Sequence, residues 1–220
     1  NKNNGLQGND LYTYTLEYPN FNQLPANGLD SEQLKSNLEQ ALSEVWQQHI
    51  ENDGYNRLLL SANLDIRQIV IIRAYGKYLR QLGLGYSEEY FQQALLAYPQ
   101  IVNELIALFD NRFALDERSI AQKKSSEVSI KARLTDRLNA VVKIDHDRIL
   151  SNFVEAICAT VRTNFYQNCA AGKVKPYCSF KIRSGEIEDA PQPRPYVETF
   201  VYSPRVEGVH LRFSNVSRGG

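Results

Sequence analysis

The sequence lacks several features that would point to a class of function. It has no methionine, one tryptophan and three cysteines among 220 residues. Its 25 basic residues are balanced by 25 acidic ones, so a net charge of zero gives no electrostatic reason to bind nucleic acid or an anionic membrane. The longest aliphatic run, Ile69 to Ile72, is far shorter than the roughly 20 apolar residues that cross a bilayer. We therefore predict that the chain binds neither nucleic acid nor a membrane.

The cysteines and histidines are spaced unlike the ligands of a metal site. Tetrahedral zinc takes its ligands in close pairs such as CxxC or HxxxH, and neither spacing occurs here. The residues concerned are Cys158, Cys169, Cys178, His49, His146 and His210. The sequence thus predicts no bound metal ion. An odd number of cysteines without a signal-peptide pattern is typical of a reducing compartment, so we expect a cytoplasmic location.

The first 28 residues have the pattern of a domain end followed by a linker. Residues 11–18 (LYTYTLEY) alternate like a half-buried strand, and residues 19–28 contain prolines and a glycine. Because a single strand is not stable alone, we expect it to complete a domain that lies mostly upstream. The chain starts without methionine and stops directly after a strand-like run, so we expect an internal segment of a longer protein.

Residues 29–168 are predicted to be helical. Asp30 and Gln33 fit a capping box, and apolar residues at three- and four-residue steps then predict one buried helix face before a stop at 52–54. These apolar residues are Leu34, Leu38, Leu42, Val45 and Trp46. Later helices are predicted over 65–82, from 88 onward, over 99–113 and over 119–142.

A final long helix is expected to be capped by Asp145 or Asp147. Apolar residues at helical spacing predict that one of its faces is buried. They are Ile149, Phe153, Ile157, Val161 and Phe165.

The region after Asn168 is predicted to be β-rich. Strands are expected over 174–182, 196–203 and 208–214, because these segments are short and rich in valine, tyrosine and phenylalanine. In the last strand, apolar and polar residues should face opposite sides. Val209, Leu211 and Phe213 form the apolar set, and His210 and Arg212 the polar one. The predicted fold class is α+β, with a predominantly helical middle segment flanked by short β regions.

A basic stripe at helical spacing, Arg73, Lys77 and Arg80, allows two interpretations. Basic residues on one helix face can contact phosphates, which would indicate nucleic-acid binding. Alternatively, they form a solvated face that pairs with nearby acids such as Glu88 and Glu89. The zero net charge favours the solvated face.

Three further segments are interpreted as turns or connectors. Gly83-Leu84-Gly85 follows a predicted helix and lacks the third glycine of a dinucleotide loop, so we expect it to end the helix. Residues 52–57 (NDGYNR) are of the types that turns collect for conformational reasons, although a functional role stays open. The proline-containing segment 190–195 is expected to be a stiff connector.

The C-terminal residues Arg218, Gly219 and Gly220 are the sharpest candidate site. A guanidinium beside two glycines presents a planar fork to a carboxylate while the backbone comes close, which suits a small dicarboxylic substrate. Arginine and glycine are also common in ordinary loops, and the pattern alone leaves that alternative open.

A series of motifs runs through the chain. They are ENDGYNRL (51–58), IRAYGKYLRQ (72–81), DHDRIL (145–150), VRTNFYQ (161–167), KPYCSFKI (175–182) and VYSPRVEGVHLR (201–212), followed by SRGG (217–220). In this order they resemble the large NAD-specific glutamate dehydrogenases of bacterial type. The resemblance covers residues 38–220 approximately.

The resemblance implies an organisation and an activity for the whole protein. Residues 1–28 would be the C-terminal end of an ACT-like domain plus linker, 29–168 a helical segment, and 169–220 the β-rich start of the catalytic, substrate-binding domain. The implied reaction converts L-glutamate, NAD and water to 2-oxoglutarate, ammonia and NADH. The family resemblance also implies a homo-oligomer with an amino-acid effector at upstream ACT-like domains.

The resemblance also assigns a substrate contact. Smaller glutamate dehydrogenases have Lys-Gly-Gly where this chain has Arg218, Gly219 and Gly220, and that lysine holds a substrate carboxylate. Arg218 would take this role with a planar fork in place of a point charge. The family's catalytic lysine and nucleotide-binding fold lie later, so we expect no catalytic or NAD-binding residues in this chain and no activity from it alone. The alternative is a helical regulatory or oligomerisation module with no catalytic role.

Overall fold

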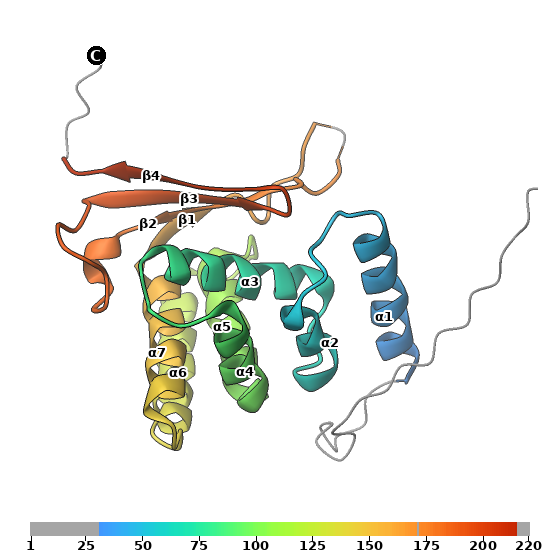
Figure 1. Ribbon diagram of the computed structural model, residues 1–220, viewed down its shortest axis with the longest axis horizontal. Helices are drawn as coiled ribbons and strands as arrows, with labels where there is room; N and C mark the ends of the chain where they lie inside the picture. The colour runs from blue at the N-terminus through green and yellow to red at the C-terminus, as the bar shows by residue number, and fades with distance from the viewer. Residues whose placement is uncertain (1–30, 171, 215–220) are drawn as a thin grey trace, which may run out of the picture.

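The computed structural model describes residues 31–170 and 172–214 and places a small sheet over a layer of helices (Figure 1). The predicted α+β class, dominated by helix, is confirmed. The expected strand at 11–18, the linker after it and the cap at Asp30 lie outside the described residues.

Helices fill the first part of the described chain and strands the last part. The helices are α1 (Ser31–Trp46), α2 (Leu58–Ser61), α3 (Ile66–Gln81), α4 (Glu88–Ala97), α5 (Pro99–Phe113), α6 (Ile120–Leu138) and α7 (Ile144–Ala159), with 3-10 helices η2 (Gly54–Arg57) and η3 (Ser184–Glu186). The strands are β1 (Thr160–Thr163), β2 (Cys178–Ile182), β3 (Val197–Ser203) and β4 (Val206–Arg212). Among the described residues, no helix combines the length and the apolar character that a membrane span needs.

The predicted helix starts are confirmed where local cap chemistry determines them. Asp65 accepts a hydrogen bond from the Gln68 amide, and the Gln68 side chain accepts one from the Asp65 amide, which makes a capping box on α3. Ser119 and Gln122 form the same arrangement on α6. Ser87 caps α4. Helix α6 ends at Leu138, earlier than predicted.

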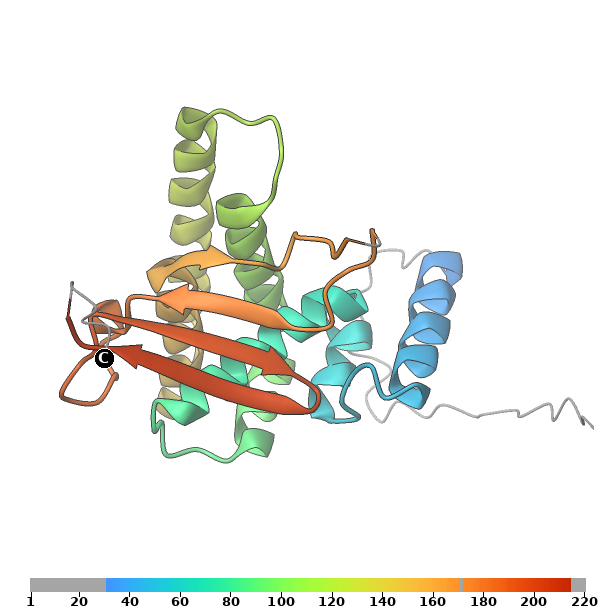
Figure 2. The ribbon, with the colours of Figure 1, turned by 90° about the horizontal axis from the view of Figure 1, so that it is seen from above.

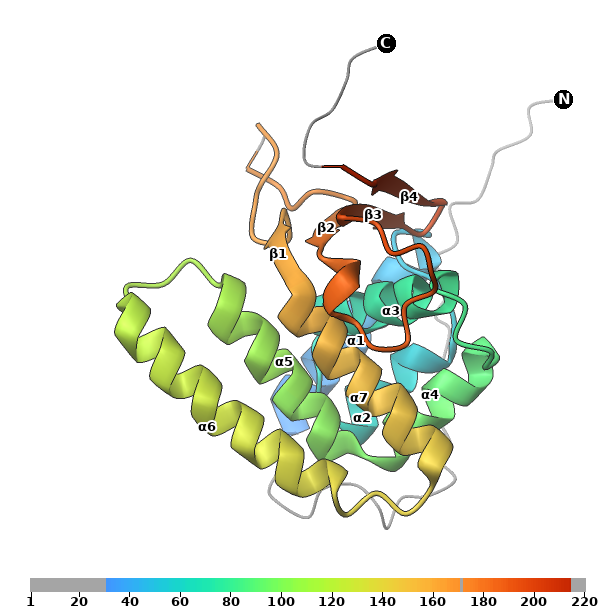
Figure 3. The same cartoon turned by 90° about the vertical axis from the view of Figure 1, so that its left-hand side faces the viewer.

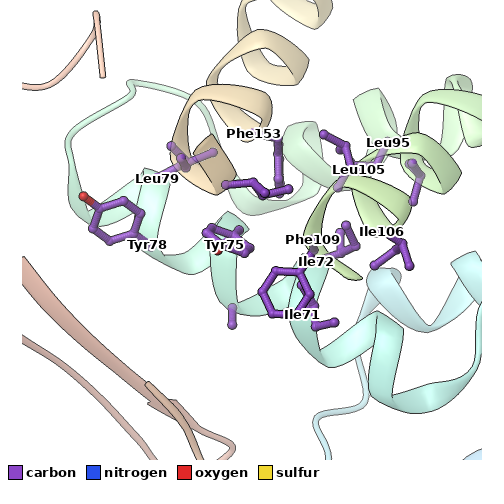
Figure 4. Packing of buried hydrophobic residues seen from close by; sticks show 14 of the residues in the cluster. Ile71, Ile72, Tyr75, Tyr78, Leu79, Leu95, Leu105, Ile106, Phe109 and Phe153 are labelled. Atoms are coloured by element: carbon purple, nitrogen blue, oxygen red, sulfur yellow. The ribbon is translucent and has the colours of Figure 1, made fainter. Parts of the chain in front are cut away.

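The core is centred on α3, whose apolar side chains meet those of α4, α5 and α7 (Figure 4). The Tyr75 ring lies 6.1 Å from the Phe109 ring and 4.7 Å from the Phe180 ring, so one side chain joins the helices to the sheet. The Tyr75 hydroxyl also lies 2.8 Å from Thr160 Oγ1. Because a buried aromatic such as Phe109 typically contributes about 3–5 kcal/mol relative to alanine, this cluster is central to stability.

The sheet has the order β1-β2-β3-β4, and each neighbouring pair is antiparallel. Phe180 pairs with Phe200, and Phe200 pairs with Val209, so these three residues lie on one face of the sheet. Leu211 pairs with Glu198 on the same face, which confirms the predicted facing of Val209 and Leu211, whereas Phe213 lies beyond the end of β4. Val209 and Leu211 remain 39% and 47% exposed, because β4 is an edge strand of the described sheet.

Helix α7 is shorter than predicted. It ends at Ala159, and the chain continues directly into β1, as Figure 3 shows. The prediction that Val161 and Phe165 lie on the helix face is therefore wrong. The physical reason is pairing with β2 from residue 160 onward, to which β-branched residues are well suited. The residue before the helix is Lys143, so Asp145 and Asp147 lie in the first turn and do not cap it.

Helix α1 is less buried than predicted. Leu34, Leu38 and Val45 pack partly against the core, but Leu42 is 48% exposed and Trp46 is 81% exposed. The expectation of a single buried face is wrong for these last two residues. Helix α1 lies at the side of the helical layer, where other described elements cover one of its flanks (Figure 1).

Candidate functional site

The predicted substrate-binding residues Arg218, Gly219 and Gly220 lie outside the described residues, so their role stays a prediction. Strand β4 is the described strand nearest to them in the sequence, because it ends at Arg212. A candidate site is therefore built from β4 and from the groups that hold it.

Arg73 on α3 is fully buried and is held by Asp53, which precedes η2. Its Nε lies 2.7 Å from Asp53 Oδ2 and its Nη2 lies 2.9 Å from Asp53 Oδ1, a two-bond fork. Nη2 also donates to Asn56 Oδ1 at 2.6 Å. Burial disfavours the charged guanidinium, but the hydrogen bond and charge of Asp53 outweigh it and raise the pKa of Arg73. The positive charge of Arg73 is thus balanced inside the protein by the carboxylate of Asp53.

Glycine allows η2 to lie directly on α3. A Cβ at Gly76 would lie 2.2 Å from the Tyr55 hydroxyl oxygen, which is closer than atoms can approach. Tyr55 itself is fully buried, and the Arg73 guanidinium carbon lies 5.8 Å from its ring centroid. The segments ENDGYNRL and IRAYGKYLRQ therefore form one packed unit.

Lys77 lies one helical turn from Arg73 and meets three carboxylates. Its Nζ lies 3.1 Å from Glu51 Oε2, 3.2 Å from Glu88 Oε1 and 3.3 Å from Glu207 Oε1. The side chain is only 12% exposed. Burial lowers its pKa, but Glu51 and Glu88 outweigh burial and raise the pKa of Lys77. Because Glu207 belongs to β4, this ammonium ties the edge strand to the helices.

Two tyrosines connect the same elements. The Tyr78 hydroxyl on α3 donates to Glu198 Oε2 on β3 at 2.8 Å, and Glu198 is only 3% exposed. Burial, followed by the Glu198 charge, raises the pKa of Tyr78. The Tyr202 hydroxyl on β3 donates to Glu51 Oε1 at 3.3 Å. The β3–β4 hairpin is thus fixed to α3 and to the chain before η2.

We name these charged groups the Arg73–Lys77 network. Its members are Glu51, Asp53, Arg73, Lys77, Glu88 and Glu207. The predicted pairing with Glu88 is confirmed, and Arg80 also pairs with it at 2.7 Å. The predicted solvated face is wrong for Arg73 and Lys77, because the sheet and η2 cover that side of α3. Opposite charges in two neighbouring motifs were the sequence signal that could have indicated this pairing.

Three carboxylates of the network come close enough to suggest a metal site. Oxygens of Glu51, Asp53 and Glu88 lie within 4.8 Å of one another. Lys77 and Arg73 already supply positive charge to the same three carboxylates, so ion pairing accounts for the cluster. The absence of a metal ion stays a prediction.

The segment Gly83-Leu84-Gly85 is the end of a helix and not a dinucleotide loop, and the absence of NAD-binding residues from the chain stays a prediction. Gly83 has a φ of +89° and follows α3, as expected of a glycine that ends a helix. A dinucleotide loop needs a preceding strand and a third glycine, and residues 83–88 provide neither.

Comparison with protein families gives two matches. Residues 133–220 match the bacterial NAD-glutamate dehydrogenase catalytic domain. Residues 50–115 match glutamate dehydrogenase helical motif 3. The chain belongs to the NAD-specific glutamate dehydrogenase family. The sequence resemblance is thereby confirmed.

Curated relatives from three bacteria carry the same description, NAD-specific glutamate dehydrogenase. The chain is 39% identical to that of Pseudomonas aeruginosa over 230 residues, which covers 100% of this chain and 14% of the relative. It is 39% identical to that of Halomonas elongata and 38% identical to that of Mycobacterium tuberculosis, each covering 82% of this chain and 11% of the relative. The chain therefore spans between 11% and 14% of the length of these NAD-specific glutamate dehydrogenases.

The Arg73–Lys77 network joins the two regions of the chain that match family models. Glu51, Arg73 and Lys77 lie within the helical-motif match, whereas Glu207 lies within the catalytic-domain match. Tyr78 and Glu198 cross the same boundary. The domain boundaries given by the sequence remain predictions.

Proposed function

We propose that this chain is part of an NAD-dependent glutamate dehydrogenase that converts L-glutamate, NAD and water to 2-oxoglutarate, ammonia and NADH. Family membership and the match of residues 133–220 to the catalytic domain support this proposal. Within it, the described residues act as scaffold, and Arg218 with Gly219 and Gly220 supplies one contact to a substrate carboxylate. The chain is expected to be inactive alone, because the family resemblance places the catalytic lysine and the nucleotide-binding fold later in the full-length protein.

The observation that carries the scaffold role is the contact of Lys77 with Glu207. Within residues 31–170 and 172–214, strand β4 pairs with β3 alone, so β3 and this ion pair hold it in position. Because β4 leads toward residues 215–220, a shift of the strand would move the proposed substrate contact.

The test of the substrate contact is Arg218→Ala in the full-length enzyme. A charge-assisted hydrogen bond contributes about 1.5–3 kcal/mol, so the KM for glutamate should rise at least about tenfold while the KM for NAD stays unchanged. Arg218→Lys should recover part of the loss, because it keeps the charge. Arg162→Ala on the exposed side of β1 is the control. An unchanged KM for glutamate in Arg218→Ala would show that the assignment is wrong.

The test of the scaffold role is Glu207→Gln in the full-length enzyme. The ion pair is partly exposed and contributes about 0.5–1 kcal/mol, so the KM for glutamate should rise about two- to fivefold. The KM for NAD should not change, which separates positioning of β4 from a general loss of folded enzyme. Equal changes in both constants would contradict the positioning role.

We also propose that the full-length protein is a homo-oligomer with α1 at a contact between copies. Leu42 and Trp46 lie one turn apart on α1 and are both exposed, which suits burial against a second copy. Sedimentation velocity of a Leu42→Glu/Trp46→Glu variant should show smaller particles. Ser36→Glu/Ser43→Glu, which adds the same charges at exposed positions of α1, should leave the assembly intact. Identical sedimentation of both variants would rule out this contact, and an ACT-like domain with an amino-acid effector stays a prediction.

We further propose a cytoplasmic location. The three cysteines Cys158, Cys169 and Cys178 are free, which suits a reducing compartment. Cell fractionation with an antibody to the native protein tests this, and recovery outside the cytoplasm would contradict it.

A further inference from the structure

A cavity of about 750 Å³ lies between α1, α3, the segment before β2 and the β3–β4 turn. Figure 2 shows the segment between β1 and β2 extending from the sheet toward α1. The volume falls within the range of roughly 300–1,000 Å³ that small-molecule sites occupy. The glutamate dehydrogenase activity proposed above makes no use of this cavity.

The cavity collects positive charge on a chain whose net charge is zero. Its lining includes four basic side chains and one carboxylate, that of Glu44. The basic residues are Arg67, Lys173, Lys175 and Arg205. Across residues 31–170 and 172–214, none of these four forms a salt bridge, which contrasts with Arg73 and Lys77 nearby.

Two of the four basic side chains, Arg67 and Lys175, are held by neutral partners. Arg67 Nη2 donates to the Phe165 carbonyl at 2.7 Å, and its guanidinium carbon lies 4.4 Å from the Phe165 ring centroid. Lys175 Nζ donates to Gln167 Oε1 at 2.9 Å. Glu44 lies 3.2 Å from His49 Nδ1, and because both side chains line the cavity, four basic residues face this one carboxylate. Fixed cations with neutral partners are suited to an incoming anion.

The remaining walls restrict the chemistry of an occupant. Ile66, Val70 and Pro204 are apolar. Burial raises the pKa of the Cys178 thiol to about 11, so at neutral pH this side chain is a neutral wall and not a nucleophile. An occupant of the cavity therefore has to carry negative charge that the basic side chains can bind, because these apolar walls and the neutral thiol offer no charged group to a cation.

We propose that this cavity binds a small multivalent anion, contacted by Arg67, Lys173, Lys175 and Arg205. Phosphate and carboxylate oxygens share the chemistry that these donors recognise. The site adjoins the Arg73–Lys77 network, because Tyr202 both lines the cavity and donates to Glu51. Arg205 lies in the β3–β4 turn, so the bound anion joins the hairpin to α3.

Isothermal titration calorimetry on the full-length protein tests this site, with pyrophosphate and tricarballylate as probes and NADH present at saturation. The variant is Lys173→Gln/Arg205→Gln, whose side chains are exposed at the rim and form no salt bridge with the described residues. The control is Lys143→Gln/Arg162→Gln, which removes the same charge at exposed positions away from the cavity. Circular dichroism establishes that each variant is folded.

The rim variant should weaken binding of at least one probe by about tenfold or more, because two charge-assisted contacts are lost. The control should bind as the wild type does. Loss confined to pyrophosphate indicates a phosphate ligand, and loss confined to tricarballylate indicates a polycarboxylate. No binding by the wild type, or equal losses in the rim and control variants, would overturn the proposal. If the double variant does not fold, Arg205→Gln alone carries the same comparison.

Discussion

Helices α1 and α3 have the same length, 16 residues, and both were predicted from the sequence. Their surroundings differ. Helix α3 lies between the sheet and the other helices, and ten of its residues are buried (Figure 1). Helix α1 lies at the side of the same layer, and its Trp46 is 81% exposed. Helical periodicity thus locates a helix, but the elements that pack on its second face decide how much of it is buried.

The second face of α3 carries the charged residues of the network. An uncompensated buried charge is strongly unfavourable, so a helix covered on both sides keeps such residues only with partners. Asp53 supplies the partner for Arg73, and three carboxylates supply it for Lys77. The elements that bury Arg73 and Lys77 also carry the carboxylates that pair with them. The charged face of α3 therefore fits only one arrangement of η2, α4 and β4.

The largest effect on this comparison is expected from removing the carboxylate that balances the buried charge of Arg73. Asp53→Ala leaves a buried guanidinium without its carboxylate, and we expect the free energy of unfolding to fall by about 3–5 kcal/mol. Urea unfolding of the chain followed by circular dichroism measures it. Asp116→Ala, which removes an exposed partner of Arg118, is the matched control and should change little. A small loss in Asp53→Ala would contradict the central role of the buried pair.

A smaller effect is expected from Gly76→Ala on the same helix. The added methyl group would meet the Tyr55 hydroxyl at 2.2 Å, so η2 must shift from α3 at a cost of about 1–3 kcal/mol. Gly185→Ala is the control, because nothing lies within 4 Å of its Cβ position. Hydrogen exchange of the amides in η2 and α3 should become faster in the first variant only. Unchanged hydrogen-exchange rates in both variants would show that η2 accommodates the added methyl group without loss of stability.

Features that depend on local chemistry were predictable from the sequence. The starts of α3, α4 and α6 follow from a capping side chain and the amides it accepts from, all within a few residues. The end of α7 was not predictable in this way. Val161 fits the helical spacing as well as Ile157 does, and the choice of strand is made by β2, far along the chain.

The candidate site required contacts that no local pattern contains. Asp53 and Arg73 are 20 positions apart, and Glu207 is much farther from Lys77, so neither pairing is visible in one motif. The motifs that carried the family resemblance did contain these four residues: Asp53 lies in 51–58, Arg73 and Lys77 in 72–81, and Glu207 in 201–212. Their opposite charges suggest that the motifs contact each other, but the sequence could not indicate which charges pair, because that depends on how η2 and the sheet lie over α3.

The smallest effect is expected at the exposed end of α1. Trp46→Gln removes a large apolar side chain, but because it is 81% exposed its loss should change the free energy of unfolding by less than about 0.5 kcal/mol in the isolated chain. Leu79→Ala on α3 is the matched comparison and should cost about 2–5 kcal/mol, since Leu79 is fully buried. Urea unfolding at several protein concentrations measures both. A loss above about 1 kcal/mol in Trp46→Gln that does not vary with concentration would mean that α1 packs within its own chain, contrary to both its exposure and the proposed contact between copies.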